Sequence, residues 1–230
     1  MSEALRALAP GLWVVERPLG NPLVEIGTRM TVVRLRDGGL FLHSPVKLDA
    51  ELCAALDALG PVRAIVCPNR AHHLFAGDYA AAYPDALLYG APNLAPKRPD
   101  LKFAEELSDA APAAWRADLE QHLFAGAPFL NEVVFFHPAT RTLLFTDLAF
   151  NIPVGGTKGA RFFCWVSGAE GRFGPHRLIR LFMMRGRAAA RRSLERILAW
   201  DFERVTVTHG EVLERGGREA VRAGFAFLDR

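Results

Sequence analysis

The sequence predicts an α/β protein in which two β-sheets pack face to face and helices cover both outer faces, a four-layer αββα sandwich. Hairpin strands open the chain and recur in its second half, and helical patterns follow each set of strands. No domain-splitting linker interrupts this order, so we expect a single domain over residues 1–230. Half of the residues (50%) are apolar, which is enough to bury a substantial core without disulfides.

The first half of the chain shows the pattern hairpin, helix, strand, helix, strand. Asp37-Gly38-Gly39 between two apolar runs is a strong hairpin signal. Apolar residues at helical spacing stop at Gly60-Pro61, and the short apolar run that follows ends at Pro68-Asn69, which indicates a helix and then a buried strand. The predicted elements are strands over 12–15, 31–35, 40–43, 62–67 and 86–89, and helices over 49–59 and 72–83.

The second half repeats the pattern after residues 90–114, which lack a clear period and are predicted to form a surface excursion. Pro138-Ala139-Thr140-Arg141 joins two apolar runs into a second hairpin. The remaining predicted elements are strands over 132–137, 142–147 and 205–208, a Gly-rich loop over 151–174, helices over 175–184 and 188–200, and an amphipathic helix from Gly217.

The composition and the absence of targeting motifs predict where the protein is found and which partners it does not have. The three cysteines are scattered without a CxxC, so a disulfide framework is not expected. Residues 1–10 carry no signal-peptide pattern and no apolar run is long enough to span a bilayer, so we expect a cytoplasmic protein without a membrane partner. Many arginines lie between Arg177 and Arg204, but no nucleic-acid motif accompanies them, so no nucleic-acid partner is expected. The oligomeric state stays open.

Four predicted strands end in side chains that ligate metals or transfer protons. These side chains are His43, the pair His72-His73 after Pro68-Asn69, Asp147, and His209. Ligand sites of open α/β sheets form beyond the carboxyl ends of strands. A single buried histidine is more often a hydrogen-bonded core residue, so the recurrence at strand ends is what predicts a site. Imidazole and carboxylate together suit zinc, iron or manganese.

With these residues the sequence resembles the metallo-β-lactamase-like superfamily over nearly the whole chain, and more closely an uncharacterised branch of it. Residues 68–73 (Pro-Asn-Arg-Ala-His-His) stand where that family has a His-x-His-x-Asp-His motif at the start of a helix. Thr146-Asp147 stands where an aspartate bridges two metals, and Thr208-His209-Gly210 where a late strand ends in His-Gly. The resemblance therefore implies the αββα fold and a metal site at these loops.

Two departures from the family pattern reduce the implied metal set. Pro68 and Arg70 replace the first two motif histidines, and proline has no side-chain donor atom while arginine stays protonated. Residues 126–132, where the family has a further histidine, contain none, and we take His122 upstream as structural. The resemblance thus implies one divalent ion, zinc first and iron or manganese next. Its implied ligands are His72 (in place of aspartate), His73, Asp147 and His209.

The implied activity is that of a metal-dependent hydrolase, in which one ion activates water against a small ester, lactone, thioester or related small-molecule substrate. Asp147 belongs to this site, and Arg70 or His43 is expected to steady an anionic substrate or a developing oxyanion. His43 also fits a role in the core or behind the metal ligands. A degenerate metal site in a ligand-binding pseudoenzyme is the alternative, and a redox or oxygen-handling iron site is a third.

Other polar and aromatic residues near these loops have competing interpretations. Asn69 suits a helix cap as well as a substrate contact, and His176 suits the start of a helix. Glu132 precedes a strand, and we assign it no role as a base. Three aromatic residues of the Gly-rich loop are predicted either to line a substrate pocket or to cover the core. They are Phe162, Phe163 and Trp165.

Overall fold

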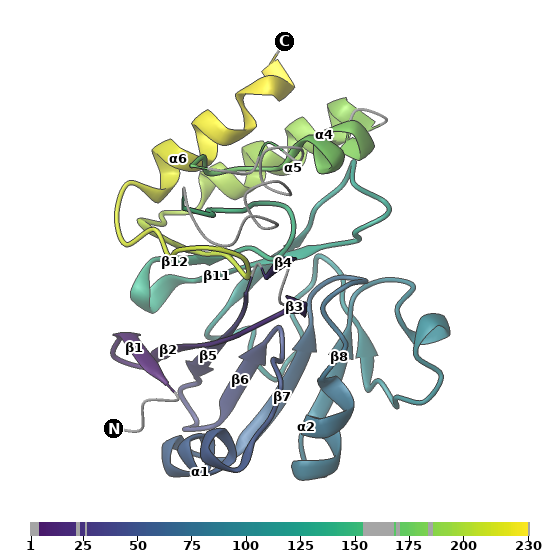
Figure 1. Cartoon of the computed structure of the whole chain (residues 1–230), viewed down its shortest axis with the longest axis vertical. Coiled ribbons are helices and arrows are strands. Elements are labelled where there is room, and N and C mark those ends of the chain that lie inside the picture. Colours follow the sequence, from purple (N-terminus) through teal and green to yellow (C-terminus); the bar gives the residue numbers. More distant parts are fainter. Residues whose placement is uncertain are drawn as a thin grey trace.

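The computed structural model describes residues 5–21, 24–25, 27–153, 168, 171–183 and 186–229. Two β-sheets face each other in the middle of the molecule, and helices lie outside both of them (Figure 1). Helices α1 (Ala50–Leu59) and α2 (Ala76–Ala82) cover one sheet. Helices α4 (Arg177–Met183), α5 (Arg187–Ala199) and α6 (Gly217–Phe225) cover the other. The predicted four-layer αββα sandwich is therefore confirmed.

The larger sheet places the first group of candidate residues. Its described strands are β1 (Arg6–Ala9), β2 (Leu12–Arg17), β5 (Thr28–Arg34), β6 (Leu40–His43), β7 (Val62–Cys67), β8 (Leu87–Gly90) and β9 (Glu105–Glu106), in the order β1-β2-β5-β6-β7-β8-β9. Strands β5 and β6 form the predicted hairpin, and β6, β7 and β8 run parallel. The segments that follow β6 and β7 therefore leave the sheet at one edge. A short ribbon pairs β3 (Gly20–Asn21) with β4 (Val24–Glu25).

The smaller sheet places the second group. Its described strands are β10 (Glu120–Leu123), β11 (Val133–His137), β12 (Thr142–Leu144) and β13 (Arg204–Thr206), in that order. Strands β11 and β12 form the second predicted hairpin, whereas β12 and β13 pair in parallel. Because β12 and β13 run in the same direction, Asp147 and His209 follow the ends of neighbouring strands.

Three apolar clusters hold the four layers together. One fills the space between the larger sheet and α1 and α2, one lies between the two sheets, and one lies between the smaller sheet and α4 to α6. Strand β7 shows the pleat that separates two of them: Ala64 and Val66 belong to the cluster between the sheets, and Ile65 and Cys67 face the helices. Each fully buried Leu, Val or Phe side chain contributes roughly 1.5–3 kcal/mol.

Two predicted elements differ from the structure. Helix α2 begins at Ala76 and not at His72, because the side-chain oxygen of Asn69 accepts the N–H groups of Ala71 and His72 and holds them in a turn. The predicted surface excursion over 90–114 is partly wrong, since it contains β9 and the buried residues Leu94 and Leu107.

Strand β10 was not predicted, because its Glu-Gln-His-Leu sequence has no apolar alternation. Its Gln121 is nevertheless buried, where it accepts the indole N–H of Trp115 at 2.9 Å. Most of the predicted loop over 151–174, with Phe162, Phe163 and Trp165, lies outside the described residues. No helix in the described part of the chain is long and apolar enough to cross a bilayer.

Candidate metal centre

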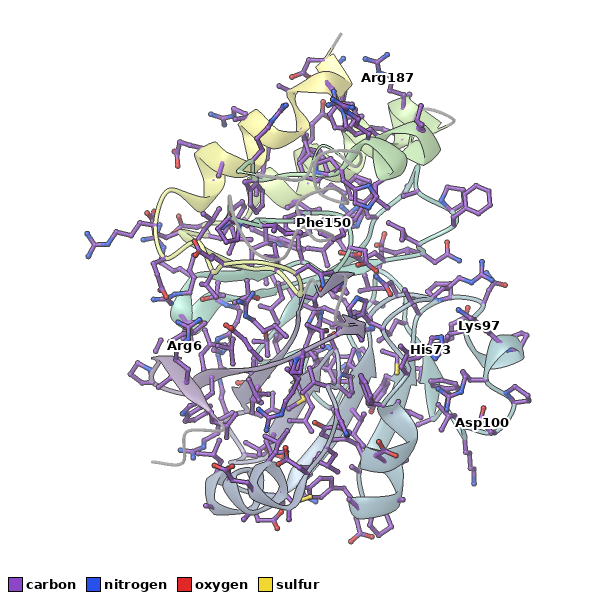
Figure 2. The ribbon with its side chains drawn as sticks, viewed as in Figure 1. Arg6, His73, Lys97, Asp100, Phe150 and Arg187 are labelled. Carbon is purple, nitrogen blue, oxygen red and sulfur yellow. The ribbon has the colours of Figure 1, made fainter. Side chains whose placement is uncertain are left out.

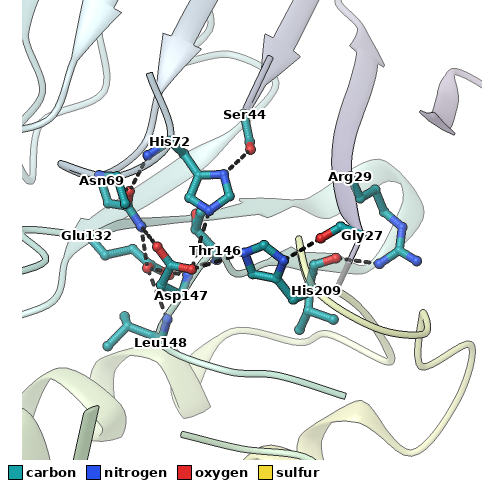
Figure 3. Close-up of polar contacts among 12 residues, drawn as sticks. Gly27, Arg29, Ser44, Asn69, His72, Glu132, Thr146, Asp147, Leu148 and His209 are labelled. Carbon is teal, nitrogen blue, oxygen red and sulfur yellow. Dashed lines mark hydrogen bonds and ion pairs between the residues drawn. The ribbon is translucent and has the colours of Figure 1, made fainter. Parts of the chain in front are cut away.

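Three side chains from three different loops meet between the sheets. Their potential ligand atoms, on His72, Asp147 and His209, all lie within 4.8 Å of one another. Nε2 of His72 is 3.3 Å from Oδ1 of Asp147, and Nε2 of His209 is 3.4 Å from the same oxygen (Figure 3). Two imidazole nitrogens and a carboxylate oxygen are a donor set that suits zinc, iron and manganese. The residues present therefore fit a divalent ion.

Each of the two histidines is anchored through its other ring nitrogen. Nδ1 of His209 donates to the carbonyl oxygen of Gly27 at 2.7 Å, and Nδ1 of His72 lies 2.8 Å from the buried hydroxyl of Ser44. A neutral imidazole that donates from Nδ1 presents a lone pair at Nε2, which is the arrangement of metal-bound histidines. Because its Nδ1 faces a carbonyl oxygen, neutral His209 has this tautomer and presents its Nε2 lone pair towards Asp147, whereas a protonated ring would donate to that carboxylate.

Asp147 is buried between these rings and stays ionised. Burial on its own raises the pKa of this carboxyl, but His72 and His209 outweigh it and hold the pKa well below the ordinary value. Its two oxygens have different partners. Oδ1 faces the two imidazoles, and Oδ2 accepts the side-chain amide of Asn69 at 2.9 Å.

Glu132 lies fully buried behind Asp147 and organises its loop. Oε1 accepts the N–H of Thr146 at 2.7 Å, and Oε2 accepts those of Asp147 and Leu148 at 2.7 and 3.0 Å. Burial raises the pKa of Glu132 to about 8, the Asp147 carboxylate adds to this rise, and the N–H donors oppose it. Sequence reasoning missed this residue, because a carboxylate before a strand gives no sign that a turn 14 residues later will donate to it.

The His209 loop is held from the side opposite Asp147. Arg29 of β5 is buried and donates to the carbonyl oxygens of Val207 and Gly210, and its guanidinium pairs with Glu16 at 2.7 Å. Gly210 has φ +100, and a Cβ at this position would collide with the carbonyl oxygen of Asn151. Position 210 therefore requires glycine, because its backbone has a positive φ and lies close to the backbone of Asn151.

A pocket of about 200 Å³ opens onto the three side chains. Its other described lining is mostly apolar: Leu19, Thr28, Pro45, Ala71, Leu74 and Phe75. Behind His209, the ring of Phe150 stacks at 5.3 Å, and His176 packs on Phe150 at 4.8 Å. His176 directly precedes α4, as predicted, and burial lowers its pKa.

The structure does not bring His73 to this group. Although it adjoins His72, its Nδ1 lies 3.0 Å from the guanidinium of Arg98, and Figure 2 shows it beside the segment that carries Lys97 and Asp100. Burial lowers the pKa of His73, and the charges of Lys97 and Arg98 lower it further. Consecutive histidines in this turn point in different directions.

His43 and Arg70 are also absent from the described lining of the pocket. His43 is buried between the sheets with its ring 5.4 Å from that of Phe135, and neither ring nitrogen has a partner within the described part of the chain. Burial lowers the pKa of His43 to about 3. Arg70 is half-buried, and its backbone N–H donates to Leu130. Only Asp147 of the three predicted catalytic residues lines the pocket.

The fold is that of the metallo-β-lactamases. Solved structures of this fold include a metallo-β-lactamase from Pontibacter korlensis, with 13% identity, 98% of each chain covered and a TM-score of 0.66. The mono-zinc form of the metallo-β-lactamase FIM-1 from Pseudomonas aeruginosa has 14% identity over 97% of this chain and 94% of that chain, with a TM-score of 0.62.

The metal-soaked Flv1 flavodiiron core from Synechocystis sp. PCC6803 has 13% identity and a TM-score of 0.68, and the match covers 98% of this chain and 60% of that one. Identities this low establish the fold alone.

No curated protein matches the sequence. A family model described as "Domain of unknown function (DUF4336)" matches residues 10–158. The chain belongs to the DUF4336 family.

Proposed function

We propose that the protein is a hydrolase with a single divalent ion, held by His72, Asp147 and His209. One observation carries this proposal: Nε2 of both histidines converges on Oδ1 of Asp147, while both Nδ1 atoms are tied to groups behind them. Metal-binding histidines have this orientation, with the second nitrogen fixed by a hydrogen bond. Zinc is the ion that we expect first, because it accepts two imidazoles and a carboxylate and leaves a further position open.

A divalent ion at this position would lower the pKa of a water molecule and polarise a carbonyl group. The protein supplies the surroundings of that chemistry. Asp147 balances one of the two positive charges, so the site would keep a net positive charge towards a developing oxyanion. The buried hydroxyl of Ser44 and the carbonyl oxygen of Gly27 keep the two imidazoles from turning away. Leu74 and Phe75 supply apolar surface on one side of the pocket.

The size and lining of the pocket also favour one class of substrate. Its volume of about 200 Å³ suits a small molecule, and its described lining contains neither lysine nor arginine. A substrate with several negative charges, such as a phosphodiester of nucleic acid, would find no cationic side chain among these residues. We therefore propose an uncharged small ester, lactone or thioester whose apolar part packs against Leu19, Leu74 and Phe75.

Metal-loaded protein tested on small chromogenic esters, lactones and thioesters decides between this function and a ligand-binding pseudoenzyme. We expect turnover that requires the added ion and is lost in His72→Ala and His209→Ala. His73→Ala is the matched control, since His73 sits in the same turn outside the three-ligand group, and it should keep the activity. Metal binding without turnover of any substrate in the zinc, iron and manganese forms would favour the pseudoenzyme.

A further inference from the structure

The two oxygens of Asp147 are not equivalent. Oδ1 lies between the two histidine rings, whereas Oδ2 accepts the side-chain amide of Asn69 at 2.9 Å. A carboxylate that bridges two metal ions through both of its oxygens offers one oxygen to each. The partner of Oδ2 therefore decides whether a second ion can bind through this oxygen.

The orientation of the Asn69 amide follows from its four partners. Its Oδ1 accepts the N–H groups of Ala71 and His72, both at 2.8 Å. Its Nδ2 donates to Oδ2 of Asp147 and, at 3.1 Å, to Oε2 of Glu132. The reverse orientation would set a carbonyl oxygen against two carboxylates and an NH₂ group against two N–H donors. Both donors and both acceptor positions of this fully buried side chain are therefore used.

Glu132 prevents the amide from moving aside. Its carboxylate is fixed by the N–H groups of Thr146, Asp147 and Leu148, so it cannot follow a displaced Asn69. The same three N–H groups fix the backbone of Asp147. Asn69 thus lies between the carboxylate of Asp147 and that of Glu132, and Glu132 is hydrogen-bonded to the turn that carries Asp147 (Figure 3).

We propose that the Asn69 amide, backed by Glu132, occupies the position at Oδ2 of Asp147 that a second cation would take, and so limits the pocket to one ion bound through Oδ1 alone. Asn69 and Glu132 are then positioning residues for Asp147. This inference rests on the proposed metal site. It explains in physical terms how a buried carboxylate keeps both oxygens satisfied with a single ion.

Cobalt(II) titration followed by visible absorption tests the inference. The variant is Asn69→Ser, because a serine hydroxyl still accepts the N–H groups of the turn but cannot donate to both carboxylates. We expect one equivalent of cobalt in the wild type. In the variant, Oδ2 is free to join the coordination, so the d–d bands should change. Because Asp147 also loses a group that holds it in place, the affinity should fall about tenfold. Asn93→Ser, at an exposed position, is the control and should leave both unchanged.

Two results of the cobalt titration would overturn the inference: two equivalents of cobalt in the wild type, or a cobalt spectrum and affinity in Asn69→Ser equal to those of the wild type. A second experiment tests the positioning role of Asn69 separately from the proposed metal site.

Urea unfolding in the presence of a chelator is measured for the wild type, Asn69→Ser, Asp147→Ala and the double variant. We expect the two changes to be coupled by about fivefold or more in the unfolding equilibrium constant. Cobalt-free wild-type protein with this coupling would contradict the proposed function and support the positioning role. Additive effects would contradict the positioning role.

Discussion

Nε2 of His209 lies 3.4 Å from Oδ1 of Asp147, although 62 residues separate them in the chain. The contact arises because Asp147 follows β12 and His209 follows β13, and these two strands are parallel neighbours. His72 reaches the same oxygen from the facing sheet, after β7. The site therefore depends on the packing of the two sheets as well as on the three residues.

His43 should make the protein sensitive to acid. Its pKa is about 3 in the fold and 6.5 in the unfolded chain, so between these values the unfolded state binds the proton and the folded state does not. Stability therefore falls as the pH falls below 6.5. From pH 7 to pH 5 the loss due to His43 is about 2 kcal/mol.

His43→Leu removes this term, and urea unfolding at pH 7 and pH 5 measures it. The variant should lose less stability than the wild type over this interval, because it lacks the buried imidazole that takes up a proton on unfolding. Equal losses in the two proteins would show that His43 takes up its proton in the folded state as readily as in the unfolded chain.

Glu132→Gln should destabilise the fold more than removal of an exposed carboxylate. The glutamine NH₂ group would face one or more of the N–H donors of residues 146–148, and an unsatisfied buried donor costs about 1–3 kcal/mol. Urea unfolding in chelator measures the loss, with Glu105→Gln on the exposed edge strand β9 as the matched control. A loss no larger than that of the control would mean that the turn does not depend on the Glu132 carboxylate.

Arg29→Met should weaken metal binding without touching a ligand. Arg29 fixes the carbonyl oxygens of Val207 and Gly210 on both sides of His209, and its loss should let this loop shift. Groups that hold metal ligands in place typically contribute 10–100-fold in affinity, so we expect a loss of about tenfold or more. Competition with a chelator measures it, and Arg36→Met, with a largely exposed side chain, should bind as the wild type does. Equal affinities in both variants would argue against this role.

The fold and three of the residues that meet in the pocket can be predicted from the sequence. Turn signals, helical spacing and buried runs located nearly every long element, and His72, Asp147 and His209 were identified at the ends of strands. The direction of His73 was not accessible, because it depends on a turn that Asn69 caps and that replaces the first residues of the predicted helix. Glu132 was missed because its partners are backbone N–H groups of a distant turn.

The metal content of protein purified without chelator tests the central claim most directly, with His72→Ala, His209→Ala and His73→Ala measured beside the wild type. We predict about one equivalent of zinc, iron or manganese in the wild type and in His73→Ala. The same metal should be absent from folded His72→Ala and His209→Ala. Folded wild-type protein that neither carries nor takes up a divalent ion, or loss of the ion in His73→Ala alone, would contradict the three-ligand site.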